Sequence, residues 1–182
     1  MSAQTQSRGA KSERRPLKPR LVRLGLELGL VLLVLVGVNA WQTRNHLSRQ
    51  PAPSFELTSL GGSTVSLESL RGKRVLLHFW ATWCGVCKLE LAGLSAVHAR
   101  LGPDEALITV VADADDRAAV ARFVAERELR YPVLLADERV LGQYRVSAFP
   151  TSYFIAPDGR VSSVSVGLST RLAYRVRLWL AR

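Results

Sequence analysis

The 182-residue chain is poor in cysteine and histidine, and each shortage excludes a class of site. It has only two cysteines, Cys84 and Cys87, which excludes a scaffold of several disulfides and a zinc site of four cysteines. It has three histidines and none after His98, so a metal site would find few nitrogen ligands. We therefore expect neither a metal nor another cofactor.

Acidic residues are scarce near the N-terminus, where most of the formal net charge of +10 lies. Residues 1–23 contain seven Lys or Arg and one acid, Glu13, and are predicted to form a basic cytoplasmic tail. A domain that binds nucleic acid needs a basic cluster on its folded part, and the rest of the sequence shows none. No nucleic-acid partner is therefore expected.

An apolar run follows the basic tail. Residues 24–41 are mostly Leu, Val and Gly, and their length is near the minimum for a transmembrane helix. The basic residues before the run predict a single-pass anchor in a bacterial inner membrane, with the C-terminal part in the periplasm. A cleaved signal peptide is the alternative, because Val38-Asn39-Ala40 resembles a cleavage site, and it would leave a soluble periplasmic protein.

The remaining chain divides into a linker and one domain. Residues 42–53 are polar and end in Pro51-Ala52-Pro53, which is typical of a short, semi-rigid spacer. Residues 54–182 alternate apolar strands with amphipathic helices, which predicts an α/β domain with a central mixed β-sheet flanked by helices. The expected elements are a β-hairpin over 55–67, strands over 75–80, 107–112, 133–135, 151–156 and 161–166, and helices over 85–100, 115–128, 138–144 and 170–180.

The strongest motif is Trp83–Cys87, which follows the apolar strand and begins a predicted helix. Two cysteines three positions apart can form a disulfide on the first helical turn, where the helix N-terminus stabilises a thiolate. We therefore predict that Cys84 is the exposed nucleophile and Cys87 the shielded resolving thiol in disulfide exchange. A structural disulfide is the alternative, although so short a loop would contribute only about 2 kcal/mol.

The second motif is Phe149-Pro150-Thr151, at the start of a predicted strand. A cis peptide before Pro150 would turn the backbone and leave a neighbouring amide or carbonyl group free for a substrate strand. An ordinary trans proline that ends a loop is the alternative. The predicted substrate-binding residues flank the two motifs and are Trp83, Gly85, Val86, Phe149 and Thr151.

Residues 54–182 resemble thioredoxin-fold proteins of the membrane-anchored TlpA/ResA/CcmG (DsbE) group, with the closest similarity to ScsD-type protein disulfide oxidoreductases. The similarity rests on Phe79–Cys87, on Phe149-Pro150-Thr151 and, more weakly, on Arg177–Leu180. It implies a thioredoxin fold with an added N-terminal hairpin, and a cis Pro150 that faces Cys84. It also implies protein thiol or disulfide substrates, a DsbD-like membrane electron donor and a monomer.

Two ionisable residues near the cysteines are candidates for proton transfer. The resemblance implies that Glu90 matches an acidic residue that the group often carries three positions after the second cysteine, where it assists proton movement. A solvated helix carboxylate is the alternative for Glu90. His78 departs from ordinary thioredoxins, which have a buried acid at this position, and it is either a proton relay or a satisfied core histidine.

The resemblance favours a reductase over two alternatives. A disulfide oxidase of the DsbA type has a large helical insertion, for which the predicted helices leave no space. A copper-handling or metal-stress binding protein of the SCO type pairs CxxxC with a distant histidine, and this chain has CxxC instead. Candidate substrates are apocytochrome thiols in cytochrome c biogenesis, copper-site proteins connected with copper tolerance, and oxidised proteins under metal stress.

Overall fold

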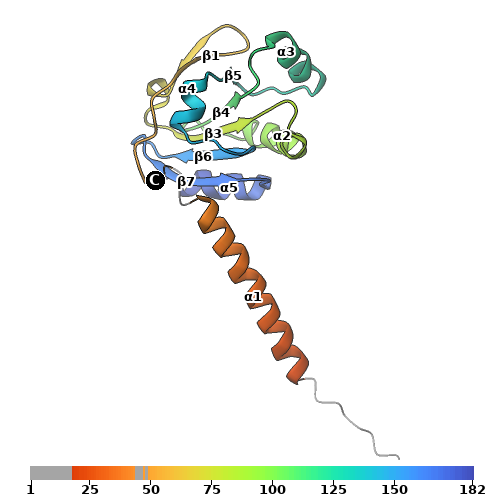
Figure 1. Cartoon of the computed structure of the whole chain (residues 1–182). Coiled ribbons are helices and arrows are strands. Elements are labelled where there is room, and N and C mark those ends of the chain that lie inside the picture. The colour runs from red at the N-terminus through yellow and green to blue at the C-terminus, as the bar shows by residue number, and fades with distance from the viewer. Residues whose placement is uncertain (1–17, 44–46, 48) are drawn as a thin grey trace, which may run out of the picture. The chain divides into compact units, whose positions relative to one another are not determined.

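The computed structural model describes residues 18–43, 47 and 49–182, and its contacts divide the chain into two units, Met1–Val38 and Asn39–Arg182. Helix α1, Lys18–Thr43, contains the apolar run, and many of its leucine and valine side chains are exposed (Figure 1). No helix in the described part of the chain is long and apolar enough to cross a membrane. The anchor over residues 24–41 stays a prediction, and residues 1–17 of the predicted tail lie outside the described residues.

The second unit is built on a five-stranded mixed sheet in the order β5-β4-β3-β6-β7 (Figure 1). The central strand β3, Arg74–Trp80, pairs in parallel with β4, Glu105–Val111, which pairs in parallel with β5, Val133–Leu135. On its other edge β3 pairs antiparallel with β6, Thr151–Ile155, and β6 pairs antiparallel with β7, Val161–Val166. The predicted mixed sheet is confirmed.

Helices cover both faces of the sheet because β3 is apolar on both sides. The even-numbered residues Leu76 and Trp80 join a core with α2 (Gly85–His98), α3 (Arg117–Glu126) and α5 (Arg171–Leu180). The odd-numbered residues join a second core with the N-terminal hairpin and α4, and their partners include Phe55, Val140 and Tyr144. Helix α4 spans Glu138–Gln143.

The predicted N-terminal hairpin is present as a separate two-stranded sheet. Strand β1, Glu56–Thr58, pairs antiparallel with β2, Thr64–Ser66, and a short 3-10 helix, Glu68–Leu70, follows. Gly62 lies in the turn with φ +94°, a conformation that favours glycine. A bridge between Ser59 and Leu134 joins the hairpin to the edge of the main sheet.

The predicted linker over residues 42–53 packs partly onto the domain. Leu47 is buried in the second core, the Arg49 amide donates to the Val161 carbonyl at 2.7 Å, and the Ala52 amide donates to the Gly159 carbonyl at 2.9 Å. The folded unit therefore begins several residues before Ser54. The sequence did not reveal this because prolines and polar residues suit a spacer and an edge-pairing segment equally well.

Candidate active site

The two cysteines lie at the N-terminus of α2 and form a disulfide with a Cα–Cα distance of 5.3 Å. Cys84 is the N-cap residue, and its Sγ accepts a hydrogen bond from the Cys87 amide at 3.1 Å. Cys84 keeps 6% of its surface exposed, whereas Cys87 is fully buried. Cys84 is the more exposed of the two, although it is less open than expected, and the roles of the two thiols stay predictions.

The turn between β3 and α2 is held by Asp113, a residue that the sequence analysis did not identify. The Thr82 amide donates to Asp113 Oδ1 at 2.9 Å, and the Thr82 hydroxyl donates to Oδ2. Asp113 follows β4 closely, so the parallel pairing of β3 and β4 brings the two turns to the same edge of the sheet. The sequence did contain a signal for this contact, because Asp113 is a short polar residue that follows a buried parallel strand.

The peptide bond between Phe149 and Pro150 is cis, which confirms that expectation. The Trp83 and Phe149 rings are 5.7 Å apart and nearly perpendicular, so this loop lies beside the cysteine motif. The Pro150 carbonyl accepts from the Gly167 amide at 2.8 Å. Among the described residues, the backbone amide and carbonyl of Phe149 have no hydrogen-bond partner. They are therefore available to an incoming strand.

The predicted substrate-binding residues divide into exposed and buried groups. Trp83, Gly85 and Val86 are exposed, and Phe149 is half-buried beside them. Thr151 is fully buried, and its hydroxyl donates to the Ala148 carbonyl at 2.8 Å. Thr151 therefore supports the loop and presents no side chain to solvent.

His78 and Glu90 form a buried pair behind the cysteines. Glu90 lies one helical turn after Cys87 on the same side of α2. Its Oε1 is 3.4 Å from His78 Nε2, and its Oε2 accepts from the Ser169 amide at 3.0 Å. His78 Nδ1 is 2.9 Å from Ser152 Oγ. The alternative of a solvated carboxylate is wrong for Glu90, which is 3% exposed.

Burial shifts the two pKa values in opposite directions. It raises the pKa of Glu90 to about 7, although the Ser169 amide and the nearby Tyr174 hydroxyl favour the carboxylate. It lowers the pKa of His78 to about 3, so His78 is neutral at physiological pH. Burial and the Glu90 carboxylate also raise the pKa of Tyr174. Glu90 is thus the group of this pair that gains and loses a proton near neutrality.

The sequence analysis named His78 and Glu90 but did not place them together. It also missed Ser152, Ser169 and Tyr174, which surround the pair. The Tyr174 ring lies edge-on to His78, with 6.2 Å between ring centroids. Serine in strand β6 and before α5 gave no sequence signal, because serine is common at both kinds of position.

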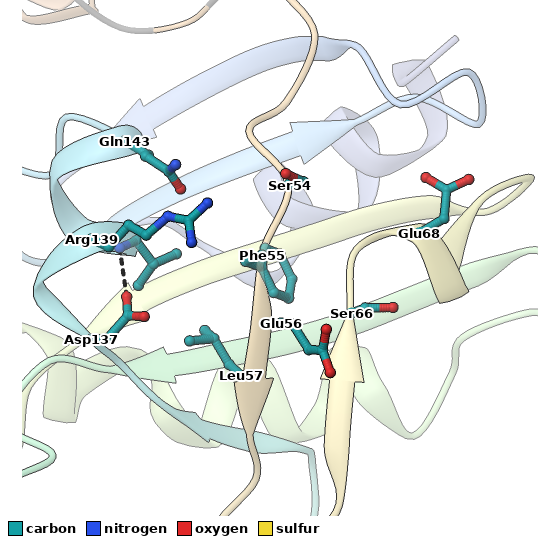
Figure 2. Close-up of a pocket in the computed structure, with 10 residues that line it drawn as sticks. Ser54, Phe55, Glu56, Leu57, Ser66, Glu68, Asp137, Arg139 and Gln143 are labelled. Atoms are coloured by element: carbon teal, nitrogen blue, oxygen red, sulfur yellow. Dashed lines mark hydrogen bonds between the residues drawn. The ribbon is translucent and has the colours of Figure 1, made fainter.

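A cavity of about 410 Å³ lies away from the cysteines, between the hairpin strands and α4. Figure 2 shows Glu56, Arg139 and Gln143 around it, with Phe55 among them. Neither cysteine nor Pro150 lines this cavity. Within the residues that the structure describes, no group of three His, Cys, Asp or Glu side chains could hold a metal ion.

Thioredoxin-fold enzymes that exchange thiols and disulfides place a cysteine pair at a helix N-terminus in this way, and the chain is a thiol–disulfide oxidoreductase of that class. It belongs to the AhpC/TSA family, whose sequence signature matches residues 48–164, and within the thioredoxin-like proteins to the TlpA/ResA/CcmG group. This confirms the resemblance to that group. The finer similarity to ScsD-type proteins stays a prediction.

Three similar proteins illustrate this membership. The thiol-disulfide oxidoreductase ResA of Bacillus cereus (strain ZK / E33L) is 34% identical over 122 residues, which cover 66% of this chain and 70% of ResA. The structure of a thiol:disulfide interchange protein from Chlorobium tepidum TLS is 25% identical with a TM-score of 0.67, covering 72% of this chain and 94% of that chain. An exposed lipoprotein thioredoxin from Streptococcus pneumoniae strain TIGR4 is 28% identical with a TM-score of 0.65, covering 70% and 98%.

Proposed function

We propose that the chain is an exported protein-disulfide reductase in which Cys84 is the nucleophile and Cys87 the resolving thiol. The observation that carries this proposal is the unequal exposure of the two sulfurs at the N-terminus of α2, beside a loop with unpaired backbone groups. The free groups of Phe149 would pair with an extended substrate segment, since strand addition is a common mode of peptide recognition. Trp83, Gly85 and Val86 would contact the same segment.

The reduced enzyme would act in two steps. The Cys84 thiolate attacks one sulfur of a substrate disulfide, forms a mixed disulfide and releases the first substrate thiolate. Cys87 then loses its proton and attacks Cys84 Sγ, which forms the Cys84–Cys87 disulfide and releases the second substrate thiolate. Two electrons pass to the substrate, and a dithiol protein such as a DsbD-like membrane donor returns them. The disulfide in the structure corresponds to the oxidised state.

Glu90 would receive the proton of Cys87. It lies one turn beyond Cys87, and its pKa of about 7 allows it to accept and return a proton at neutral pH. His78 would act through Glu90 as a positioning residue, because its Nε2 faces Glu90 Oε1 while Ser152 holds its other nitrogen. The lowered pKa of His78 keeps it neutral, so His78 would not carry the proton as an imidazolium.

We assign the direction of electron flow, from this protein to its substrate, from the similarity to the family. The charges near the cysteines do not indicate it. Gly85 and Val86 add no charge between the cysteines, so they do not favour the oxidised or reduced form. A reduction potential near that of thioredoxin, about −270 mV, would support the reductase, and one near −120 mV would support a disulfide oxidase. A copper-binding protein remains the other alternative, and copper titration of the reduced protein tests it.

Export and tethering are also part of the proposal. Support comes from the basic residues before the apolar run, from the exposed leucines and valines of α1, and from the lipoprotein nature of the pneumococcal relative. Protease treatment of spheroplasts should degrade the domain from outside, and carbonate extraction should leave the full chain in the membrane. Recovery of the intact chain in the cytosol would contradict export.

The central experiment traps substrates in cells. Cys87→Ser should accumulate mixed disulfides through Cys84, which are visible on non-reducing gels and identifiable by mass spectrometry. The matched control is Cys84→Ser combined with Cys87→Ser, which has no sulfur to trap with. Equal adducts from both variants, or none from Cys87→Ser, would contradict the assigned roles.

A further inference from the structure

Helix α5 has an apolar face that is turned away from its own domain. Tyr174 and Leu178 pack into the core, while four other apolar side chains of this helix point outward. Each of these outward residues is between 45% and 73% exposed; they are Leu172, Val176, Trp179 and Leu180. Their spacing of four, three and one residues forms a continuous stripe on the side of α5 opposite the buried face.

Arginines flank this stripe, and no acid interrupts it. From Gly159 to Arg182 the sequence contains five arginines and no Asp or Glu. Arg175 is neutralised by Glu105 at 2.8 Å. In the described part of the chain, no carboxylate lies within ion-pair distance of Arg171, Arg177 or Arg182. The guanidinium of Arg182 lies 5.0 Å from the centre of the Trp179 ring.

An exposed apolar stripe with tryptophan and flanking arginines is the pattern of a helix that lies in a membrane interface. The arginine stems cover apolar surface while their charges reach lipid headgroups, and tryptophan favours the headgroup level. A protein partner that covered this stripe would have to be acidic at its edges. An anionic lipid surface supplies that complementarity without any specific partner.

The C-terminal end of α5 lies beside the segment with which the folded domain begins. The segment that follows α1 docks on the turn before β7, where Pro51 bridges to Arg160 and the Ala52 amide bonds Gly159. The same turn, with Pro157 and Asp158, lines a hollow together with Trp179 and Arg182.

We propose that the outer face of α5 docks the domain on an anionic membrane surface. The nearness of the bilayer rests on the proposed export and tether, whereas the chemistry of the face stands on the exposed stripe and its arginines. Strand β3 runs from Arg74, at this end of the domain, to Trp80, just before the cysteine turn. Trp179 and Arg182, at the C-terminal end of the stripe, therefore lie at the end of the domain away from Cys84.

The test uses the full chain in vesicles of phosphatidylcholine, with or without phosphatidylglycerol. Quenching of Trp179 by brominated lipids, taken as the part that Trp179→Phe removes, reports the docked fraction. Docking should need phosphatidylglycerol, and Arg171→Gln with Arg182→Gln should weaken it about fivefold for each charge lost. Leu172→Ser should weaken it about tenfold. The matched control Arg130→Gln, an exposed arginine outside α5, should leave it unchanged.

Equal quenching with and without phosphatidylglycerol would overturn the proposal, because the stripe would then be covered by something uncharged. Quenching that falls on protein dilution at constant lipid would also overturn it, in favour of a second copy of the chain. Carbonate extraction of the same vesicles reports the tether separately. A chain that is extracted but still shows lipid-dependent quenching would refute the anchor and support docking by α5.

Discussion

The two sides of the central sheet differ in how completely their buried polar groups are satisfied. On the side of α4 and the hairpin, the Tyr144 hydroxyl donates to the Pro53 carbonyl at 2.8 Å, and the Tyr153 hydroxyl donates to the Tyr144 carbonyl. On the side of α2 and α5, several buried polar atoms have no hydrogen-bond partner among the described residues. They are His78 Nε2, Trp80 Nε1, Glu90 Oε1 and the hydroxyl of Tyr131.

This difference separates stability from chemistry. An unsatisfied buried polar group costs about 1–3 kcal/mol, so a core selected for stability alone would not keep several of them. The side covered by α2 and α5 also contains Cys87 and the Glu90 carboxyl. Burial raises the pKa of Glu90 to about 7. We infer that the hairpin side stabilises the fold, while the α2 side is kept polar for proton transfer. Four substitutions test this division, from the largest expected effect to the smallest.

Cys84→Ser should lower the rate of insulin-disulfide reduction by a thousandfold or more, on the order expected when a nucleophile is removed. The loss of the short disulfide should cost only about 2 kcal/mol of unfolding free energy. Turnover and urea unfolding of the same preparation measure both quantities. Leu89→Ala, on the same helix, is the control, and residual turnover in Cys84→Ser would show that another group is the nucleophile.

Phe55→Ala should act only on stability. Phe55 is buried on the hairpin side, with its ring 6.4 Å from that of Tyr144. Removing it should lower the free energy of unfolding by about 3–4 kcal/mol and leave turnover per folded molecule unchanged. Urea unfolding and insulin reduction at low temperature measure the two effects. A large fall in turnover of the folded protein would break the proposed division.

Glu90→Gln should change the pH dependence of stability and of turnover. In the wild type, unfolded Glu90 ionises near pH 4.5 and the folded group near pH 7, so stability falls as pH rises through this window. Glutamine does not ionise, so the variant should become relatively more stable with rising pH, by about 3 kcal/mol in total. Its turnover should also fall at neutral pH.

Unfolding curves at pH 5 and pH 8 measure the effect on stability. His78 is present in both proteins, so its own titration cancels in the comparison. The control is Glu138→Gln, which replaces an exposed glutamate at the start of α4. A constant stability difference between Glu90→Gln and wild type across this pH range would show that Glu90 is ionised in the folded state throughout.

Tyr144→Phe should give the smallest effect. It removes the hydroxyl that donates to the Pro53 carbonyl and keeps the ring packing with Phe79 and Tyr153. The expected loss is about 1 kcal/mol of unfolding free energy with unchanged turnover, measured by urea unfolding. Tyr131→Phe, on the other side of the sheet, should by contrast cost little stability, because its hydroxyl has no partner in the described residues. Equal losses of unfolding free energy in the two variants would show that the two faces of the sheet do not differ in this way.

The elements and the cysteine site were predictable because their signals are local. Continuous apolar runs predicted β3 and β4, and the motifs around Cys84 and Pro150 predicted the disulfide and the cis peptide. The burial of Glu90 was not predicted from its position in the helix. Glutamate is common on helix surfaces, which is why a solvated carboxylate was the alternative for Glu90. The structure contradicts it, because Glu90 is buried.

The contacts between distant residues could not be predicted. His78 meets Glu90 only because the register of β3 places it on the same face as Leu76 and Trp80, beneath α2. The outward face of α5 was equally hidden, since its apolar residues fit a core as well as a surface. The buried face of α5 carries the polar hydroxyl of Tyr174, whereas the exposed stripe is apolar, so composition did not show which side was buried.

The two hydrogen bonds between Thr82 and Asp113 bear on which residues of the cysteine motif can change in related sequences. Because the Asp113 carboxylate, just after β4, holds Thr82 in the turn before α2, the path of the chain into Cys84 is fixed by contacts outside the dipeptide between the cysteines. Gly85 and Val86 are exposed and could change while Cys84 stays in place. The residues that fix the turn and the residues exposed between the cysteines are thus separate, so a change in one set need not disturb the other.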